Sequence, residues 1–303
     1  MSVAAACGGS QVAGSEGVPG HGLPAGDVER IVAAIPEAAP AQPAEARRVL
    51  VFSRAQGFRH EAIPRGMVWI EQMGVRTGAF EVVISDDLAM FEEDALGGFH
   101  GVVLNNTSGD AFLPTGGEAE GMSEEELAEA RARDARLRTN LMAWIEGGGG
   151  FIGIHAATDT FYTWPEYGRM IGGYFDGHPW NADARVTVKV ESPEHPLNAA
   201  FADTPTFELT EEIYQFKEPY EAGRQQVLLR LDPEANRFDL PGTNRDDKDF
   251  PLSWIRTQGE GRVFYFALGH NAHIFENPAL AAHFLAGMQW ALGDLEAPTP
   301  PGD

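Results

Sequence analysis

The segment "GGGGFIGIHAAT", residues 147–158, decides the fold. Four glycines lead into the apolar run 151–154, which ends at His155. Apolar residues without alternation are typical of a strand buried on both faces, as in parallel sheets covered by helices. The small residues around His155 favour a tight strand-to-helix turn that lifts one side chain above the sheet, as in a nucleophile elbow. We therefore predict a parallel strand over 151–154 and a functional role for His155.

The chain before this segment alternates between predicted strands and helices. Apolar and β-branched runs predict strands at 47–53, 80–85 and 101–106, and a helix is predicted over 64–74. Ser123 and Glu126 form a capping-box pattern at the start of a long amphipathic helix that reaches residue 146. This alternation predicts an α/β domain in which helices cover both faces of a mostly parallel sheet.

The second half of the chain has a different pattern. Residues 185–190, "RVTVKV", alternate between apolar and polar side chains, as half-exposed antiparallel strands do. Further strands are predicted at 206–210, 225–231, 251–256 and 261–268, before a closing helix at 278–293. We therefore expect an added antiparallel portion within one domain over residues 47–295. Residues 1–46 are predicted to be a disordered tether that contains only a short possible helix at 27–35, and residues 296–303 a disordered tail.

Composition excludes two classes of partner. The 303 residues carry a net charge of −23, which repels the phosphate backbone of nucleic acids and anionic membranes. The sequence holds no apolar run of about 18 residues, so no transmembrane helix is expected.

The sequence contains one cysteine, Cys7, within "VAAACGGSQ" at residues 3–11. Small apolar residues before a cysteine resemble the end of a bacterial lipoprotein signal, although only a short segment precedes Cys7. Either the natural start lies upstream and Cys7 is lipidated, or the segment is an alanine- and glycine-rich tail with a chance cysteine. Lipidation would place the protein in the cell envelope or periplasm; otherwise the cytoplasm is expected.

Polar side chains follow several of the predicted strands. In open parallel sheets, ligands bind beyond the carboxyl ends of the strands. The residues found there are Arg59, His60, Asn105, His155, Thr158, Asp159, His270 and Asn271. Because these strand ends meet at one edge of a sheet, we expect them to form a binding pocket.

Two further segments add candidates to that pocket. Residues 172–180, "GGYFDGHPW", form an aromatic, glycine-rich loop that holds His178 and follows a short helix predicted around 165–172. Tyr162 and Trp164 lie just before that helix, and aromatic faces stack on the apolar side of sugar rings. The segment "ELTEEIYQF" supplies Glu211, Glu212 and Tyr214, although an acidic loop is also ordinary in an acidic protein.

We assign acid–base catalysis to His155, His178 and Glu212, since imidazole exchanges protons near neutral pH. The remaining candidates are expected to bind substrate. A divalent metal on His155, His178, His270 and Glu211 is a further possibility, with zinc, manganese and iron not distinguished. The alternatives are structural: His155 packed on top of the sheet, His178 in a turn before Pro179, and His60 as a helix cap.

The order of several motifs resembles one family. "VLVFSRAQGFRHEAI", "GVVLNNTSGD", "GGGGFIGIHAATDTFYTWPEYGRMIGGYFDGHPW", "EEIYQF" and "GRVFYFALGHN" together resemble the ThuA-like (trehalose-utilisation) family over about residues 47–293. The resemblance implies a flavodoxin-like, three-layer fold similar to class I glutamine amidotransferases. His155 occupies the position of the amidotransferase nucleophilic cysteine, which argues against glutamine hydrolysis.

The resemblance also implies a role in carbohydrate use, on trehalose-like disaccharides or their 3-keto derivatives, with a sugar oxidoreductase in the same pathway. Two functions stay open. One is a sugar-processing enzyme, whether hydrolase, lyase or isomerase. The other is a non-catalytic sugar-binding envelope protein that uses the same pocket.

Overall fold

The computed structural model describes residues 20–299, and within them nine strands form one mixed sheet. Its parallel part has the order β2-β1-β3-β4-β11, which is the 2-1-3-4-5 order of flavodoxin-like folds. The strands of this part are β1 (Arg48–Phe52), β2 (Glu81–Ile84), β3 (Gly101–Asn105), β4 (Gly150–Ile154) and β11 (Gly261–Phe266). The predicted parallel α/β core is confirmed.

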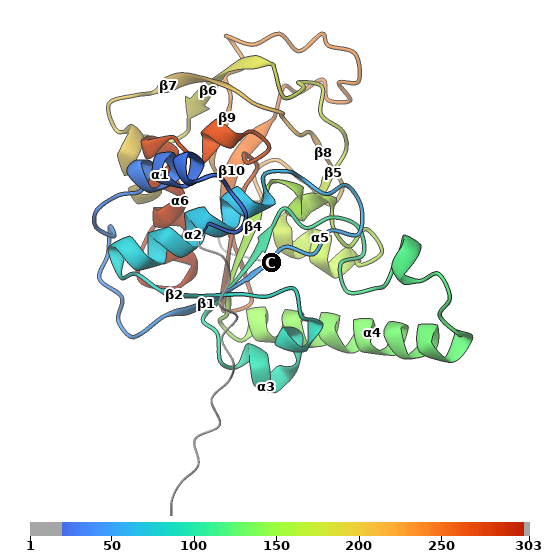
Figure 1. Ribbon diagram of the computed structural model, residues 1–303. Coiled ribbons are helices and arrows are strands. Elements are labelled where there is room, and N and C mark those ends of the chain that lie inside the picture. The colour runs from blue at the N-terminus through green and yellow to red at the C-terminus, as the bar shows by residue number, and fades with distance from the viewer. Residues whose placement is uncertain (1–19, 300–303) are drawn as a thin grey trace, which may run out of the picture.

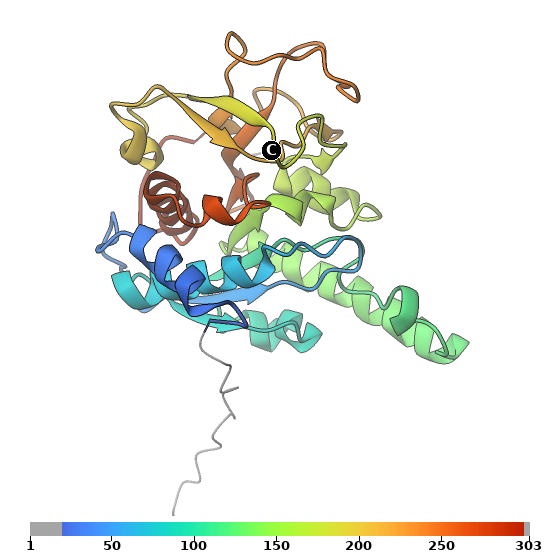
Figure 2. The same cartoon turned by 45° about the horizontal axis from the view of Figure 1, so that its top comes forward.

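An antiparallel extension continues the sheet beyond β11. Its strands, in spatial order, are β10 (Pro251–Gln258), β9 (Gln226–Leu231), β6 (Arg185–Val190) and β7 (Thr206–Thr210). Every second residue of β6 is buried, which fits the alternation in its sequence. Figure 2 shows the yellow and orange strands of this extension at the top of the molecule, above the blue strand of the parallel part. A separate short pair, β5 (Tyr174–Phe175) and β8 (Phe216–Lys217), lies in the loops.

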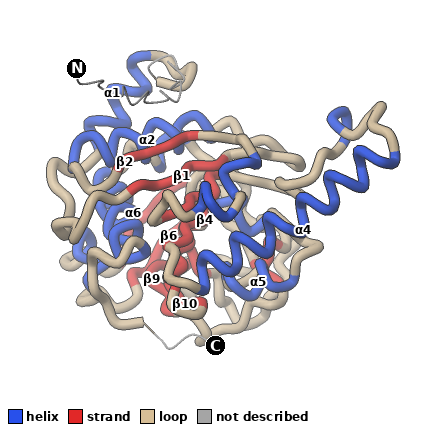
Figure 3. The backbone as a smooth tube through the Cα atoms, turned by 90° about the horizontal axis from the view of Figure 1, so that it is seen from below, coloured by secondary structure: helices blue, strands red, loops and turns tan. Residues whose placement is uncertain are grey.

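Helices cover both faces of the sheet, as Figure 3 shows for α2 and α6 on one side and α4 and α5 on the other. The first layer holds α1 (Ala25–Ala34), α2 (Ile63–Thr77) and α6 (Pro278–Ala291). The second holds α3 (Glu93–Leu96), α4 (Glu124–Glu146) and α5 (Pro165–Ile171). The apolar side chains of the described residues accordingly pack as two clusters, one on each face. Trp69 stacks on Phe284 in the first, and Leu137 and Leu141 bury against the sheet in the second.

The capping box predicted for the long helix is present. Ser123 Oγ accepts a hydrogen bond from the Glu126 N–H at 3.2 Å, and the Glu126 carboxylate accepts one from the Ser123 N–H at 2.7 Å. The amino-terminal half of α4 extends beyond the rest of the fold (Figure 1). Among the described residues, no helix combines the length and the apolar composition needed to cross a bilayer.

The amino-terminal region differs from the expected disordered tether over part of its length. Residues 20–46 are ordered, and Ile31 and Ile35 are buried in the same cluster as the side chains of α2 and α6. Gln289 of α6 exchanges two hydrogen bonds with the backbone of Ala41, at 2.9 and 2.7 Å. The short possible helix at 27–35 corresponds to α1, but the surrounding glycines, prolines and alanines gave no sign that it packs against the fold.

The carboxyl-terminal tail also makes contacts. The ring of His195 is 3.0 Å from the carbonyl oxygen of Pro298, and Glu296 pairs with Arg262. The expected boundary at residue 295 therefore falls within ordered chain. Cys7 lies outside the described residues, and its lipidation stays a prediction.

Candidate functional site

The candidate site lies beyond the carboxyl ends of the parallel strands. His60 follows β1, His155 follows β4 and His270 follows β11. Glu212 follows β7, so the antiparallel extension supplies the carboxylate to a group of histidines from the parallel part. Chain segments far apart in the sequence thus meet at the edge where this class of sheet binds its ligands.

His155 occupies a tight left-handed turn. Its φ angle is +45°, a conformation that non-glycine residues adopt only when the surrounding structure holds them there. The β4 strand ends directly before it, and a single 3-10 helix, η3 (His155–Asp159), follows. Asn106 fastens the turn, because its side chain accepts from the Ala156 N–H and donates to the Gly269 carbonyl. The sharp turn expected from the sequence is confirmed, with a 3-10 helix in place of an α-helix.

A cavity of about 230 Å³ opens at this edge, and we call it the histidine cavity. It is lined by Phe58, His60, Asp159, Phe175, His178, Glu212, Tyr214 and His270. His155 lies directly behind, fully buried, with its ring stacked on Tyr214 at 4.1 Å between centroids. Pockets for drug-sized ligands occupy about 300–1,000 Å³, so this one suits a single small ring.

Glu212 is the centre of the polar contacts. Its Oε1 lies 3.4 Å from both His155 Nε2 and His270 Nδ1, and its Oε2 lies 3.5 Å from His178 Nδ1. On the other side of the His155 ring, Nδ1 is 2.7 Å from the carbonyl oxygen of Ala267. A carbonyl only accepts, so Nδ1 carries the hydrogen and Nε2 faces Glu212.

The surroundings fix the charge of several groups. Burial works to raise the pKa of Glu212, but the nearby imidazoles of His155 and His270 outweigh it and hold that pKa well below its usual range. The carboxylate of Glu212, 3.4 Å from Nδ1, in turn raises the pKa of His270. Burial, together with the neighbouring histidines, lowers the pKa of His60 to about 3. At neutral pH the cavity therefore holds an ionised carboxylate and a neutral His60.

Glu211 has a different task from the one expected. Its carboxylate is fully buried and accepts hydrogen bonds from the backbone N–H groups of Gly269, His270 and Asn271, at 3.2, 2.6 and 3.1 Å. Because both oxygens are engaged, Glu211 holds the loop that carries His270 and is not placed to ligate a metal. Glu212 lies in the cavity instead.

Several predicted residues do not line the cavity. Asn105 is fully buried, and its amide donates to Ser53 Oγ and to the Ile63 carbonyl. Thr158 pairs with the hydroxyl of Tyr265. The others with structural surroundings are Trp164, packed against Phe161, and Asn271, whose amide donates to the carbonyls of Ala182 and Thr210.

Two predicted residues lie at or beyond the edge of the cavity. The hydroxyl of Tyr162 donates to Asp159, which does line it, so Tyr162 is one contact away. Arg59 is exposed and is not part of the lining, although its neighbours in sequence are. In an extended loop, the side chain between two cavity-lining residues points away from the cavity. The sequence alone could not show whether this loop is extended.

Phe58 and Phe175 line the cavity and were not among the predicted residues. Phe58 is 64% exposed and meets the ring of His60 edge-on, and Phe175 packs on Tyr214 at 4.3 Å. The sequence could have indicated them by position, since Phe58 is close to His60 and Phe175 lies in the aromatic loop before His178.

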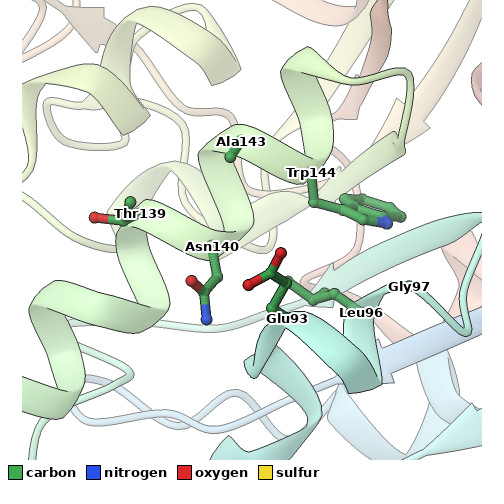
Figure 4. Close-up of a pocket in the computed structure, with 7 residues that line it drawn as sticks. All are labelled: Glu93, Leu96, Gly97, Thr139, Asn140, Ala143 and Trp144. Carbon is green, nitrogen blue, oxygen red and sulfur yellow. The ribbon is translucent and has the colours of Figure 1, made fainter.

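A larger hollow of about 440 Å³ lies between α3 and α4 (Figure 4). Its lining consists of Glu93, Leu96, Gly97, Thr139, Asn140, Ala143 and Trp144, with no histidine among them. Gly97 and Trp144 precede the amino ends of β3 and β4, the end of the sheet opposite to the histidine cavity. The larger volume of this hollow therefore does not make it the better candidate, because the titratable groups converge at the histidine cavity.

Comparisons with known proteins agree with this architecture. A family model named ThuA, described as trehalose utilisation, matches residues 48–291. A putative ThuA-like protein from Bacteroides uniformis superposes with a TM-score of 0.62 and 22% identity, over 83% of this chain and 94% of that one. A second, from Parabacteroides merdae, gives 0.56 and 18%, over 85% and 95%. No curated protein matches the sequence.

Proposed function

The chain belongs to the ThuA family of trehalose utilisation, and from that premise we propose that the histidine cavity binds and processes a disaccharide or keto-sugar. The observation that carries the proposal is the composition of the cavity. Imidazoles and carboxylates gather there beside the exposed ring of Phe58 and the rings of Phe175 and Tyr214. Sugars need both kinds of surface, apolar faces for the ring and polar groups for the hydroxyls.

The size of the cavity supports a single sugar ring inside it. About 230 Å³ is below the range of pockets that enclose a drug-sized ligand. The second ring of a disaccharide would lie outside, where Phe58 presents an exposed aromatic face. A keto-sugar arises by oxidation of a hydroxyl, so the proposal includes a sugar oxidoreductase as the source of the substrate.

We assign the proton transfer to His178. Its side chain is 42% exposed, lines the cavity, and has Nδ1 3.5 Å from Glu212 Oε2. With Nδ1 turned to the carboxylate, Nε2 is the atom left to exchange a proton with a sugar. A positioned imidazole of this kind typically contributes about 10²–10⁴-fold to a rate. The low pKa of Glu212 makes it a weak base, so its role is to hold the imidazoles in place.

The test is a turnover screen of the full chain on disaccharides and their 3-keto derivatives, with product analysis. His178→Gln is expected to lower turnover at least 100-fold. His273→Gln is the matched control, because His273 is exposed on η5 (Ala272–Ile274) and lies outside the cavity lining. Turnover that survives His178→Gln would overturn the assignment.

Calorimetry with the same sugars separates the catalytic proposal from the non-catalytic alternative. Binding without any product would favour a sugar-binding protein. The absence of both binding and product would contradict the catalytic proposal and the non-catalytic alternative alike. Glutamine hydrolysis is not proposed, because the residue at the turn after β4 is His155 and the sequence holds only Cys7.

Lipidation of Cys7, and with it a place in the cell envelope, is proposed from the sequence pattern alone. Mass spectrometry of the native amino-terminus tests it. A diacylated or triacylated cysteine supports it, and an unmodified terminus that retains residues 1–6 overturns it in favour of the cytoplasm.

A further inference from the structure

The histidine cavity contains buried imidazole nitrogens without hydrogen-bond partners. Within residues 20–299, His60 Nδ1, His155 Nε2 and His270 Nδ1 are all buried and unpaired. His155 is fully buried and His60 is 4% exposed. More than about 90% of buried polar groups in proteins are paired, so three such atoms at one place indicate a missing ligand.

The orientation of His155 identifies the kind of ligand. Its Nδ1 hydrogen is donated to the Ala267 carbonyl, so in the neutral form of the ring a lone pair on Nε2 faces Glu212 Oε1, 3.4 Å away. Two acceptors that face one another repel unless a cation lies between them. A proton on Nε2 would satisfy this pair.

The same carboxylate oxygen faces a second unpaired nitrogen, and one proton does not satisfy both. His270 Nδ1 also lies 3.4 Å from Glu212 Oε1. A metal ion accepts lone pairs from several nitrogens and from an oxygen at once. In a tetrahedral zinc site, bonds of about 2.0–2.1 Å place neighbouring ligand atoms about 3.3–3.5 Å apart, which matches these separations.

The three rings cross one another at steep angles, and one ligand atom of each lies near the others. The ring planes of His60 and His155 meet at 86°, those of His60 and His270 at 90°, and those of His155 and His270 at 74°. One ligand atom from each of His60, His155, His270 and Glu212 lies within 4.8 Å of the others.

Outer contacts hold these side chains in place, as they do in established metal sites. The Ala267 carbonyl fixes the tautomer of His155, and Tyr214 stacks on its ring. Glu211 accepts the backbone N–H of His270 at 2.6 Å and so fixes the loop that carries this ring.

We propose that His60, His155, His270 and Glu212 bind one divalent first-row transition-metal ion at the inner end of the histidine cavity. Three imidazoles and a carboxylate suit zinc, iron, cobalt or manganese, whereas calcium and magnesium require sites made of oxygen. The set differs from the one expected from the sequence, since His60 and Glu212 take the places of His178 and Glu211. Metal binding stands independently of sugar turnover.

The experiment is a calorimetric titration of the chelator-treated full chain with Zn²⁺, Mn²⁺ and Ca²⁺ at pH 7.5. We expect one Zn²⁺ per chain, Mn²⁺ bound more weakly at the same site, and no saturable uptake of Ca²⁺. His60→Gln, His155→Gln and His270→Gln should each weaken Zn²⁺ binding at least tenfold. The absence of saturable Zn²⁺ and Mn²⁺ binding by the wild type would overturn the proposal.

Two variants give the titration its controls. His273→Gln should bind Zn²⁺ as the wild type does, and a loss equal to that of His60→Gln would show adventitious surface binding and overturn the proposal. His178→Gln should keep Zn²⁺ while it loses turnover. Zn²⁺ binding without sugar turnover by the wild type would contradict the proposed function and still support the metal site. If a ligand variant does not fold, as circular dichroism would show, wild-type stoichiometry and the His273→Gln result decide.

Discussion

Removal of the Glu211 carboxylate tests how the loop of His270 is held. In the structure this buried side chain accepts the backbone N–H groups of Gly269, His270 and Asn271. Glu211→Ala leaves all three donors without their acceptor, while Glu211→Gln keeps one oxygen in reach of them. The two variants therefore separate the loss of the hydrogen bonds from the loss of the charge.

The magnitude follows from the number of donors. Each buried donor that loses its partner lowers the free energy of unfolding by about 1–3 kcal/mol, so three such donors give an upper limit of about 3–9 kcal/mol. Burial raises the pKa of Glu211, which shows that the ionised group is itself costly to bury, and water can enter the space left behind. We therefore expect Glu211→Ala to lower the free energy of unfolding by about 2–5 kcal/mol and Glu211→Gln by about 1–2 kcal/mol.

The assay is urea unfolding at pH 7.5, followed by circular dichroism. The matched control is Glu208→Ala, on the same stretch of chain, where an exposed carboxylate pairs with Arg185. Such a surface pair contributes about 0–1 kcal/mol. A Glu211→Ala protein within about 1 kcal/mol of Glu208→Ala would refute the reasoning, because the loop would then not depend on the carboxylate.

Three further predictions address the body of the fold. Burial lowers the pKa of His283 from 6.5 to about 4, so as the pH falls the unfolded chain binds this proton before the folded chain does. The free energy of unfolding is therefore highest above pH 6.5 and decreases as the pH falls towards 4, by about 2 kcal/mol at pH 5. The His283→Gln variant should lack this loss in urea melts between pH 7.5 and 5. Gly66→Ala would place a Cβ 2.1 Å from Asn105 Oδ1 and should cost about 1–3 kcal/mol, whereas Gly117→Ala, with nothing within 4 Å, should be near neutral. Ile31→Ala should lower the free energy of unfolding by about 2–5 kcal/mol in the same melts, because α1 is packed against the fold. A neutral result would favour the disordered tether predicted from the sequence.

The parallel core was predictable because its signals are local. The apolar run before His155 has no alternation, and the capping box at Ser123 marks the start of α4 without knowledge of any distant contact. The turn at His155 was predictable for the same reason, since small neighbours permit a left-handed backbone there. The short helix at 27–35 was recognisable from the sequence, but its packing was not, because that depends on α2 and α6, which lie far along the chain.

The site was predictable in outline and not in its partition of roles. The rule for strand ends placed His60, His155 and His270 at one edge, but it could not show which way each side chain turns. Glu211 and Glu212 are adjacent and chemically identical, yet one turns to backbone N–H groups and the other into the cavity. That choice depends on tertiary contacts with the loop after β11, which no local pattern encodes.

X-ray absorption at the zinc edge of the wild-type protein, loaded with one equivalent of Zn²⁺, tests the central claim most directly. The account predicts scattering from three imidazole rings, with nitrogen at about 2.0–2.1 Å, and from one carboxylate oxygen. An ion surrounded by oxygen alone, or by a single imidazole, would contradict the convergence of His60, His155 and His270 on one point.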